Sequence, residues 1–154
     1  MTDQDPARQA SSQPEPAGEF QEIEHTADLA IRVRGEDLVA LFVHAAHGMF
    51  HLLRCRPVER AAESVERDME LDAPDLETLL VDWLDELLYL SQRAGLCFET
   101  FDIHTLDDQG HLKATVHASG SQTPQRDIKA VTFSDLRIVQ QEDGAYETTI
   151  TFDV

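Results

Sequence analysis

Residues 29–53 read LAIRVRGEDLVALFVHAAHGMFHLL, and the hydrophobic period changes part-way along this stretch. In its first part Leu29, Ile31 and Val33 alternate with small or charged residues, as expected for a strand with one buried face. After Gly35 the apolar residues recur every three or four positions, which predicts an amphipathic helix. A strand that leads directly into a helix requires packing partners for both apolar faces, so this stretch indicates a mixed fold.

A second helix is predicted between Asp72 and Gly95. Asp75 can cap its first turn, Pro74 fits the start of a helix, and Gly95 is typical of a helix end. The apolar residues of this segment recur at helical spacing: Leu76, Leu79, Leu80, Trp83, Leu84, Leu87 and Leu88. They form one wide face that must be covered by the rest of the protein.

Strands are expected on both sides of the second helix. Residues 64–71 (SVERDMEL) predict a short strand, and residues 111–118 and 150–154 alternate in polarity as strands do. Between positions 128 and 139 the apolar residues change parity, which predicts a bulge or two short strands. Two helices with the strands concentrated late in the chain indicate a single α+β domain, with both helices on one face of a mostly antiparallel sheet.

Residues 1–18, MTDQDPARQASSQPEPAG, differ in composition from the rest of the 154-residue chain. They are polar, contain no aromatic residue and bury too little apolar surface to offset the entropy of ordering. We therefore expect a disordered acidic and polar tail over 1–18 and one folded domain over 19–154. A domain of that size can bury a core without disulfides or metals.

The composition favours a cytoplasmic protein. The apolar runs are too short to span a bilayer, and no charged segment followed by an apolar one suggests an export signal. Cys55 and Cys97 are far apart and follow no metal-binding or redox spacing, so both are predicted to be reduced thiols.

The charge balance is strongly acidic. Thirty acidic residues against twelve basic ones give a formal net charge of −18, and the chain has only two lysines, Lys113 and Lys129. Proteins that bind a phosphate backbone need clustered Lys and Arg, so the composition argues against independent RNA or DNA binding. An acidic surface is instead attracted to a positively charged protein surface. Solubility in a salt-rich cytoplasm is the alternative explanation.

Four short motifs together resemble the archease family. They are EHTAD at 24–28, followed by Gly35; VDWLDELLY at 81–89; IKAVT at 128–132; and FDV at 152–154. Each is weak alone because short motifs recur by chance, but their order and spacing are specific. The resemblance covers residues 20–154.

This resemblance implies a function carried out through a partner. Archeases are small α+β proteins that act with the GTP-dependent RNA ligase of the RtcB type, which joins RNA ends in tRNA splicing and RNA repair through a guanylylated histidine. They promote guanylylation and sustained turnover of that ligase, and they carry a bound metal, typically calcium. A chaperone-like modulation of a tRNA methyltransferase is the second role that the resemblance implies. The chain is thus expected to be an activator rather than an enzyme.

The chain departs from the family pattern in two places. The family commonly has Tyr-His after its Lys-Ala-Val-Thr element, where this chain has Phe133 and Ser134. A role of that histidine is therefore not expected in this chain. The family often has glycine shortly after its first aspartate, where this chain has Ala30.

The candidate metal ligands are Asp28, Asp153 and the terminal carboxylate of Val154. By parity, Asp28 lies away from the buried face of its strand, and Asp153 does the same on the last strand. If these strands are neighbours, their carboxylates share an uncovered face. Carboxylate oxygens suit Ca²⁺, or Mg²⁺ or Mn²⁺, better than Zn²⁺. The structural alternative is that Asp28 is a turn or capping residue and Asp153 part of a frayed end.

Three further residues are candidates for activation or partner contact. His25 is interpreted as a ligand, a group that orients one, or a buried structural histidine. Lys129 matches the family's functional lysine, and it could neutralise carboxylates or reach a partner's phosphate or carboxylate. Asp135 is a weaker candidate near the same site. A surface lysine without a role is the alternative for Lys129.

Two other clusters are interpreted as solvated helix faces. His44, His47 and His51 share a face of the first helix but lack a zinc-binding pattern. Asp82, Asp85 and Glu86 lie opposite the apolar face of the second.

No catalytic residue is predicted, because no nucleophile elbow, phosphate-binding loop or dinucleotide fingerprint occurs. A metal-dependent phosphoesterase is the enzymatic alternative, since a carboxylate-bound metal can hydrolyse a phosphoester.

Overall fold

The structure, a computed structural model, describes residues 19–24, 28–133 and 135–154. Its elements are β1 (Phe20–Glu24), β2 (Leu29–Gly35), α2 (Leu38–Leu52), β3 (Arg56–Pro57), β4 (Val65–Asp72), α3 (Leu76–Ala94), β5 (Thr100–Leu106), β6 (His111–Ala118), β7 (Gln122–Thr123), β8 (Ala130–Thr132), β9 (Val139–Gln140) and β10 (Tyr146–Asp153). This content confirms the predicted α+β class. The parity change after position 128 corresponds to the two short strands β8 and β9.

The described strands pair antiparallel throughout and fall into three sheets. The largest has the order β1-β2-β10-β8, and β9 also pairs with β10. The second is β4-β6-β5, and β3 with β7 makes a small third. The last strand of the chain therefore lies between β2, near the start of the fold, and β8. This adjacency positions the candidate site.

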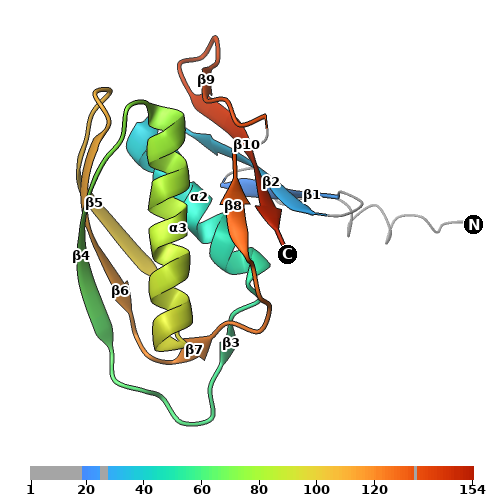
Figure 1. Cartoon of the computed structure of the whole chain (residues 1–154), viewed down its shortest axis with the longest axis vertical. Helices are drawn as coiled ribbons and strands as arrows, with labels where there is room; N and C mark the ends of the chain where they lie inside the picture. Colours follow the sequence, from blue (N-terminus) through green and yellow to red (C-terminus); the bar gives the residue numbers. More distant parts are fainter. Residues whose placement is uncertain (1–18, 25–27, 134) are drawn as a thin grey trace, which may run out of the picture.

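The two helices lie between the two larger sheets (Figure 1). Helix α2 contacts β1, β2 and β10 of the five-stranded sheet and β5 of the other, while α3 contacts β8 and β4. Trp83 of α3 is fully buried, and its indole N–H donates to the Phe42 carbonyl oxygen of α2 at 2.9 Å. Because buried indole N–H groups need an acceptor, this bond allows the largest core side chain to sit between the helices.

Both helices begin and end where local chemistry predicts. Asp37 accepts a hydrogen bond from the backbone N–H of Ala40 at 2.8 Å, and Asp75 accepts one from that of Thr78 at 2.7 Å. The hydrogen bonds from Thr78 lower the pKa of Asp75 below its usual value. Gly95 ends α3 in the left-handed region, with a φ of 69°. The N-cap aspartates therefore satisfy backbone donors that the first turn leaves free.

Some sequence predictions concern parts that the structure does not describe. The tail over residues 1–18, His25 and Ser134 lie outside the described residues. Within the described ranges, no helix has both the length and the apolar character needed to cross a bilayer. The tail remains a prediction.

Candidate functional site

The pairing of β2 with β10 brings together two aspartates from opposite ends of the chain. In this antiparallel register Leu29 lies opposite Phe152. Asp28 and Asp153 are the next residues beyond that pair, so they are level with each other at one end of the two strands. Opposed residues of antiparallel strands point to the same face, with Cβ atoms about 5 Å apart. The strand adjacency that the predicted metal site requires is therefore present.

The two aspartates alternate with core residues. Ile31, Ile150 and Phe152 have no exposed surface and belong to the core beneath the sheet. Asp28 is half-buried and Asp153 is exposed, as expected for the opposite parity. Val154 follows with 43% of its surface exposed. Carboxylates at these positions are open to solvent and to a partner.

Lys129 is fixed beside Asp153 through its backbone. The Lys129 N–H donates to the Asp153 carbonyl oxygen at 2.7 Å, and the next residue, Ala130, pairs with Asp153 in the β8–β10 register. The Lys129 side chain is exposed. The lysine of the IKAVT motif therefore directly precedes β8, the strand that pairs with β10, and lies beside Asp153.

Three polar side chains of α3 hold the segment around β8. Gln92 donates to the Ile128 carbonyl oxygen at 3.0 Å, Asp85 accepts from the Val131 N–H at 3.4 Å, and Glu77 accepts from the Ile138 N–H at 3.1 Å. These contacts were not predicted. The sequence contains a signal for them, because positions 77, 85 and 92 are two helical turns apart and thus form one polar stripe on α3.

The residues present suit a hard cation but form a sparse ligand set. Among the described residues, no group of three or more His, Cys, Asp or Glu side chains is placed to hold a metal ion. The candidate ligands are therefore two side-chain carboxylates and a main-chain oxygen of Val154, with water completing the shell. Such oxygen ligands match Ca²⁺ or Mg²⁺ rather than Zn²⁺.

Asp135 has a conformation that explains its residue type without a ligand role. Its φ is 56°, in the left-handed region that Asp adopts more readily than most residues, and its side chain is exposed. Asp153 pairs with Ala130 at the start of β8, whereas Asp135 follows Thr132 at the other end of this strand. Within the described residues, no hydrogen bond or ion pair joins Asp135 to the aspartate pair, so its functional role stays a prediction.

Comparisons with known proteins identify the family to which the chain belongs. The model of the Archease protein family (MTH1598/TM1083) matches residues 20–154. The chain belongs to the archease family. The protein archease of Methanosarcina mazei is 32% identical over 148 residues, covering 92% of this chain and 99% of that protein.

Two solved structures share the archease fold. The solution structure of Methanobacterium thermoautotrophicum protein 1598 has a TM-score of 0.66 at 30% identity, covering 88% of this chain and 98% of that one. The crystal structure from Thermotoga maritima described as an archease, possible chaperone (TM1083) has a TM-score of 0.59 at 20% identity, covering 86% of this chain and 94% of that one. At that identity the second likeness supports the fold alone.

The pKa of Asp85, in the second archease motif, is raised above the usual value for aspartate. Desolvation raises its pKa, the hydrogen bond from the Val131 N–H lowers it, and the charge of Asp82 raises it. A raised folded-state pKa adds stability below the unfolded pKa, and this contribution is lost as the pH rises through the folded value. The charged carboxylate of Asp85 therefore lowers the stability of the folded state at neutral pH.

Asp85→Asn should accordingly be neutral or stabilising at pH 7. The amide oxygen can still accept the Val131 N–H, while the charge is removed. We expect a gain of up to about 0.5 kcal/mol in the free energy of unfolding, because the residue is partly exposed. Urea unfolding at pH 7 and pH 4 checks this. A loss of stability at pH 7 that exceeds the loss at pH 4 would contradict it.

The histidine face of α2 is covered more than predicted. His44 and His47 are half-buried, so the interpretation as a solvated face is wrong for these two. Nδ1 of His44 lies 2.7 Å from the Arg34 carbonyl oxygen, and Nδ1 of His47 lies 2.9 Å from Glu19. The reason is that β2, which carries Arg34, and Glu19, the residue before β1, pack against this face, which helical periodicity could not show.

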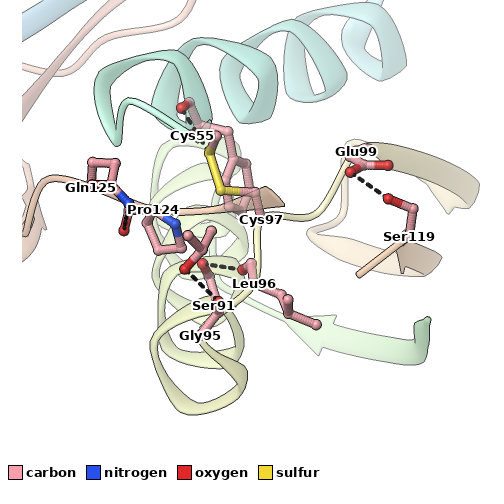
Figure 2. Close-up of a disulfide and its surroundings, with 11 residues drawn as sticks. Cys55, Ser91, Gly95, Leu96, Cys97, Glu99, Ser119, Pro124 and Gln125 are labelled. Carbon is pink, nitrogen blue, oxygen red and sulfur yellow. Dashed lines mark hydrogen bonds between the residues drawn. A yellow bond between two sulfur atoms is a disulfide. The ribbon is translucent and has the colours of Figure 1, made fainter. Parts of the chain in front are cut away.

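The prediction of two reduced cysteines is also wrong. Cys55 and Cys97 form a disulfide across a sequence separation of 42 residues (Figure 2). Cys55 follows α2 and Cys97 follows α3, and packing of the helices brings the two ends together. No local spacing encodes this pairing. The cytoplasmic location, which partly depended on reduced thiols, stays a prediction.

Proposed function

We propose that this archease activates a GTP-dependent RNA ligase of the RtcB type by promoting ligase guanylylation and turnover in tRNA splicing and RNA repair. A divalent cation is part of the proposal, with calcium favoured over magnesium or manganese. Asp28, Asp153 and a main-chain oxygen of Val154 would hold it. The observation that carries the proposal is the β2–β10 register, which makes Asp28 and Asp153 level with each other beside Lys129.

The surface charge supports action through a protein partner. A net charge of −18 disfavours independent contact with RNA, and it favours approach to a basic protein surface such as the rim of a nucleotide-binding site. The aspartate pair would supply hard oxygen ligands at the point of contact. Lys129 would limit repulsion between the carboxylates or pair with an acidic group of the partner. A bound cation would supply a positive charge at this contact.

Activation also requires a thermodynamic preference. The chain must bind the guanylylation-competent arrangement of the ligase more tightly than the resting one. Equal affinity for both would leave the equilibrium between them unchanged. Strands β2, β8 and β10 provide a rigid frame for such discrimination because they belong to one sheet supported by both helices.

The test is ligase guanylylation with substoichiometric amounts of the wild-type chain and of Asp153→Asn. The amide keeps the backbone bond from Lys129 but removes the charge, so stimulation should fall by roughly tenfold or more, as expected when a metal site is impaired. Asp108→Asn is the matched control, because Asp108 is exposed in the turn between β5 and β6. Equal stimulation by all three proteins would refute the role of Asp153.

The second candidate function is a chaperone-like modulation of a tRNA methyltransferase. It rests on the family to which the chain belongs, whose member TM1083 is described as a possible chaperone. Unchanged ligation together with an altered tRNA methylation pattern would support it. Hydrolysis of a phosphoester by the chain alone, abolished in Asp153→Asn, would instead support the metal-dependent phosphoesterase.

A further inference from the structure

The disulfide opens onto a cavity that the proposed function does not use. This cavity has a volume of about 470 Å³, and both cysteines line it. The end of α2, β3, the segment after α3 and Gln122 of β7 form its walls. Cys97 is only 2% exposed, whereas Cys55 is half-buried, so Cys55 is the sulfur more open to an incoming reagent.

The lining of this cavity differs in charge from the rest of the protein. Arg54 and Arg56 both line it, and their side chains form no ion pair within the described part of the chain. The third formally charged lining residue, Glu99, accepts a hydrogen bond from the Ser119 hydroxyl at 2.9 Å (Figure 2). Two arginines without acidic partners are unusual in a chain of net charge −18.

The two histidines of the cavity already have partners. His47 lies 2.9 Å from Glu19, and His51 lies 3.7 Å from Glu22. The two glutamates thus compensate the histidines rather than the arginines. The guanidinium groups of Arg54 and Arg56 are therefore available to pair with an anion that enters the cavity.

We propose that this cavity binds a small anionic thiol, which opens the disulfide by attack on the Sγ of Cys55. The thiolate forms a bond to that sulfur, the Cys55–Cys97 bond breaks, and the electron pair leaves on Cys97, which takes up a proton. A second molecule of the thiol then attacks the mixed disulfide and releases Cys55 as a thiol and the reagent as its own disulfide. Two electrons pass from two thiols to the protein disulfide.

The protein is arranged to accommodate the opened form. Sγ of Cys55 lies 3.3 Å from the Phe50 carbonyl oxygen, which can accept a hydrogen bond from the thiol. Cys97 stays anchored, since its backbone N–H donates to the Gln122 carbonyl oxygen at 3.0 Å. Opening therefore releases one covalent link without removing the backbone bonds beside it.

Opening the disulfide also affects the segment that leads to Lys129. The backbone N–H groups of Gln125 and Arg126 both donate to the Leu53 carbonyl oxygen, at 2.9 and 3.0 Å. Leu53 lies two residues from Cys55, so these bonds are fixed by the same end of α2 that the disulfide restrains. Faster amide exchange at Gln125 and Arg126 is expected after reduction.

The test compares three small thiols of different charge: mercaptoethanesulfonate, mercaptoethanol and thiocholine. Disulfide opening in the full chain is followed by alkylation and mass spectrometry, and rates are referred to the thiolate concentration of each reagent. We expect the anionic thiol to react about fivefold faster than the neutral one, the effect of one close charge pair in a water-like medium. Repulsion by the net charge alone predicts the opposite order, with thiocholine fastest.

Two matched double variants test whether Arg54 and Arg56 cause the preference for the anionic thiol. Arg54→Gln/Arg56→Gln should abolish the preference for the anionic thiol, while Arg60→Gln/Arg67→Gln, which changes the same net charge at exposed positions outside the cavity, should keep it. If the first variant does not fold, the order of the three thiol rates in the wild type still tests the proposal. Added salt should slow the anionic thiol if the arginines attract it. Thiocholine as the fastest reagent, or a preference unchanged in the first variant, would overturn the proposal.

Discussion

Gly35→Ala is expected to destabilise the fold by about 3 kcal/mol or more, the upper range for overpacking a core. A Cβ at this position would lie 2.3 Å from the Leu41 backbone nitrogen and 2.7 Å from the Leu41 Cα. Because both are backbone atoms of α2, no side-chain rotation relieves the overlap. The end of β2 would have to separate from the first turn of the helix. Urea unfolding followed by circular dichroism measures the loss.

Gly95→Ala is the matched control for this variant. Gly95 has a φ of 69°, and a Cβ there meets nothing within 4 Å. Its substitution therefore costs only the left-handed backbone strain, about 1 kcal/mol. If Gly35→Ala were no more destabilising than Gly95→Ala, the close approach of β2 to α2 would be wrong.

Reduction of the disulfide is expected to have the second large effect. Cys55 and Cys97 are separated by 42 residues, and closing a loop of that length in the unfolded chain is worth about 4 kcal/mol in the chain-entropy model. The unfolding midpoint in urea should thus fall clearly when a reductant is added.

The double variant Cys55→Ser/Cys97→Ser provides the control. Its midpoint should match that of the reduced wild type more closely than that of the oxidised protein, and it should not respond to the reductant. A wild-type midpoint unchanged by full reduction, verified by alkylation, would contradict the stabilising role of the disulfide.

Elements encoded by short-range chemistry were predictable from the sequence. Asp75 and Gly95 define the ends of α3, and the alternation after Asp28 defines β2, because capping and side-chain periodicity depend on residues close in the chain. Strand β5 was not predicted, and its alternation is short: exposed and less exposed residues alternate from Thr100 to His104, but Thr105 is exposed as well and Leu106 is half-buried. Its pairing with β6 also contains a register shift at this point.

Features that depend on distant pairing could not be predicted. The disulfide, the division into three sheets and the contacts of His47 with Glu19 all join segments that no local pattern connects. The candidate site could be predicted only in part. Parity placed Asp28 and Asp153 on the uncovered face of each strand, but only the register shows that they are level with each other. The candidacy of Lys129 came from the family resemblance, and its position beside Asp153 came only from the structure.

The central claim is that Asp28 and Asp153 act as one cation site. The most direct measurement is a Ca²⁺ titration followed by the backbone amide resonances of both residues. We predict that the two resonances shift together with a single dissociation constant, on the order of 10⁻⁴ to 10⁻³ M for a site with few carboxylates, and that Asp153→Asn abolishes the shift at Asp28. Shifts that saturate at different concentrations, or a response at Asp28 that persists in Asp153→Asn, would contradict the account.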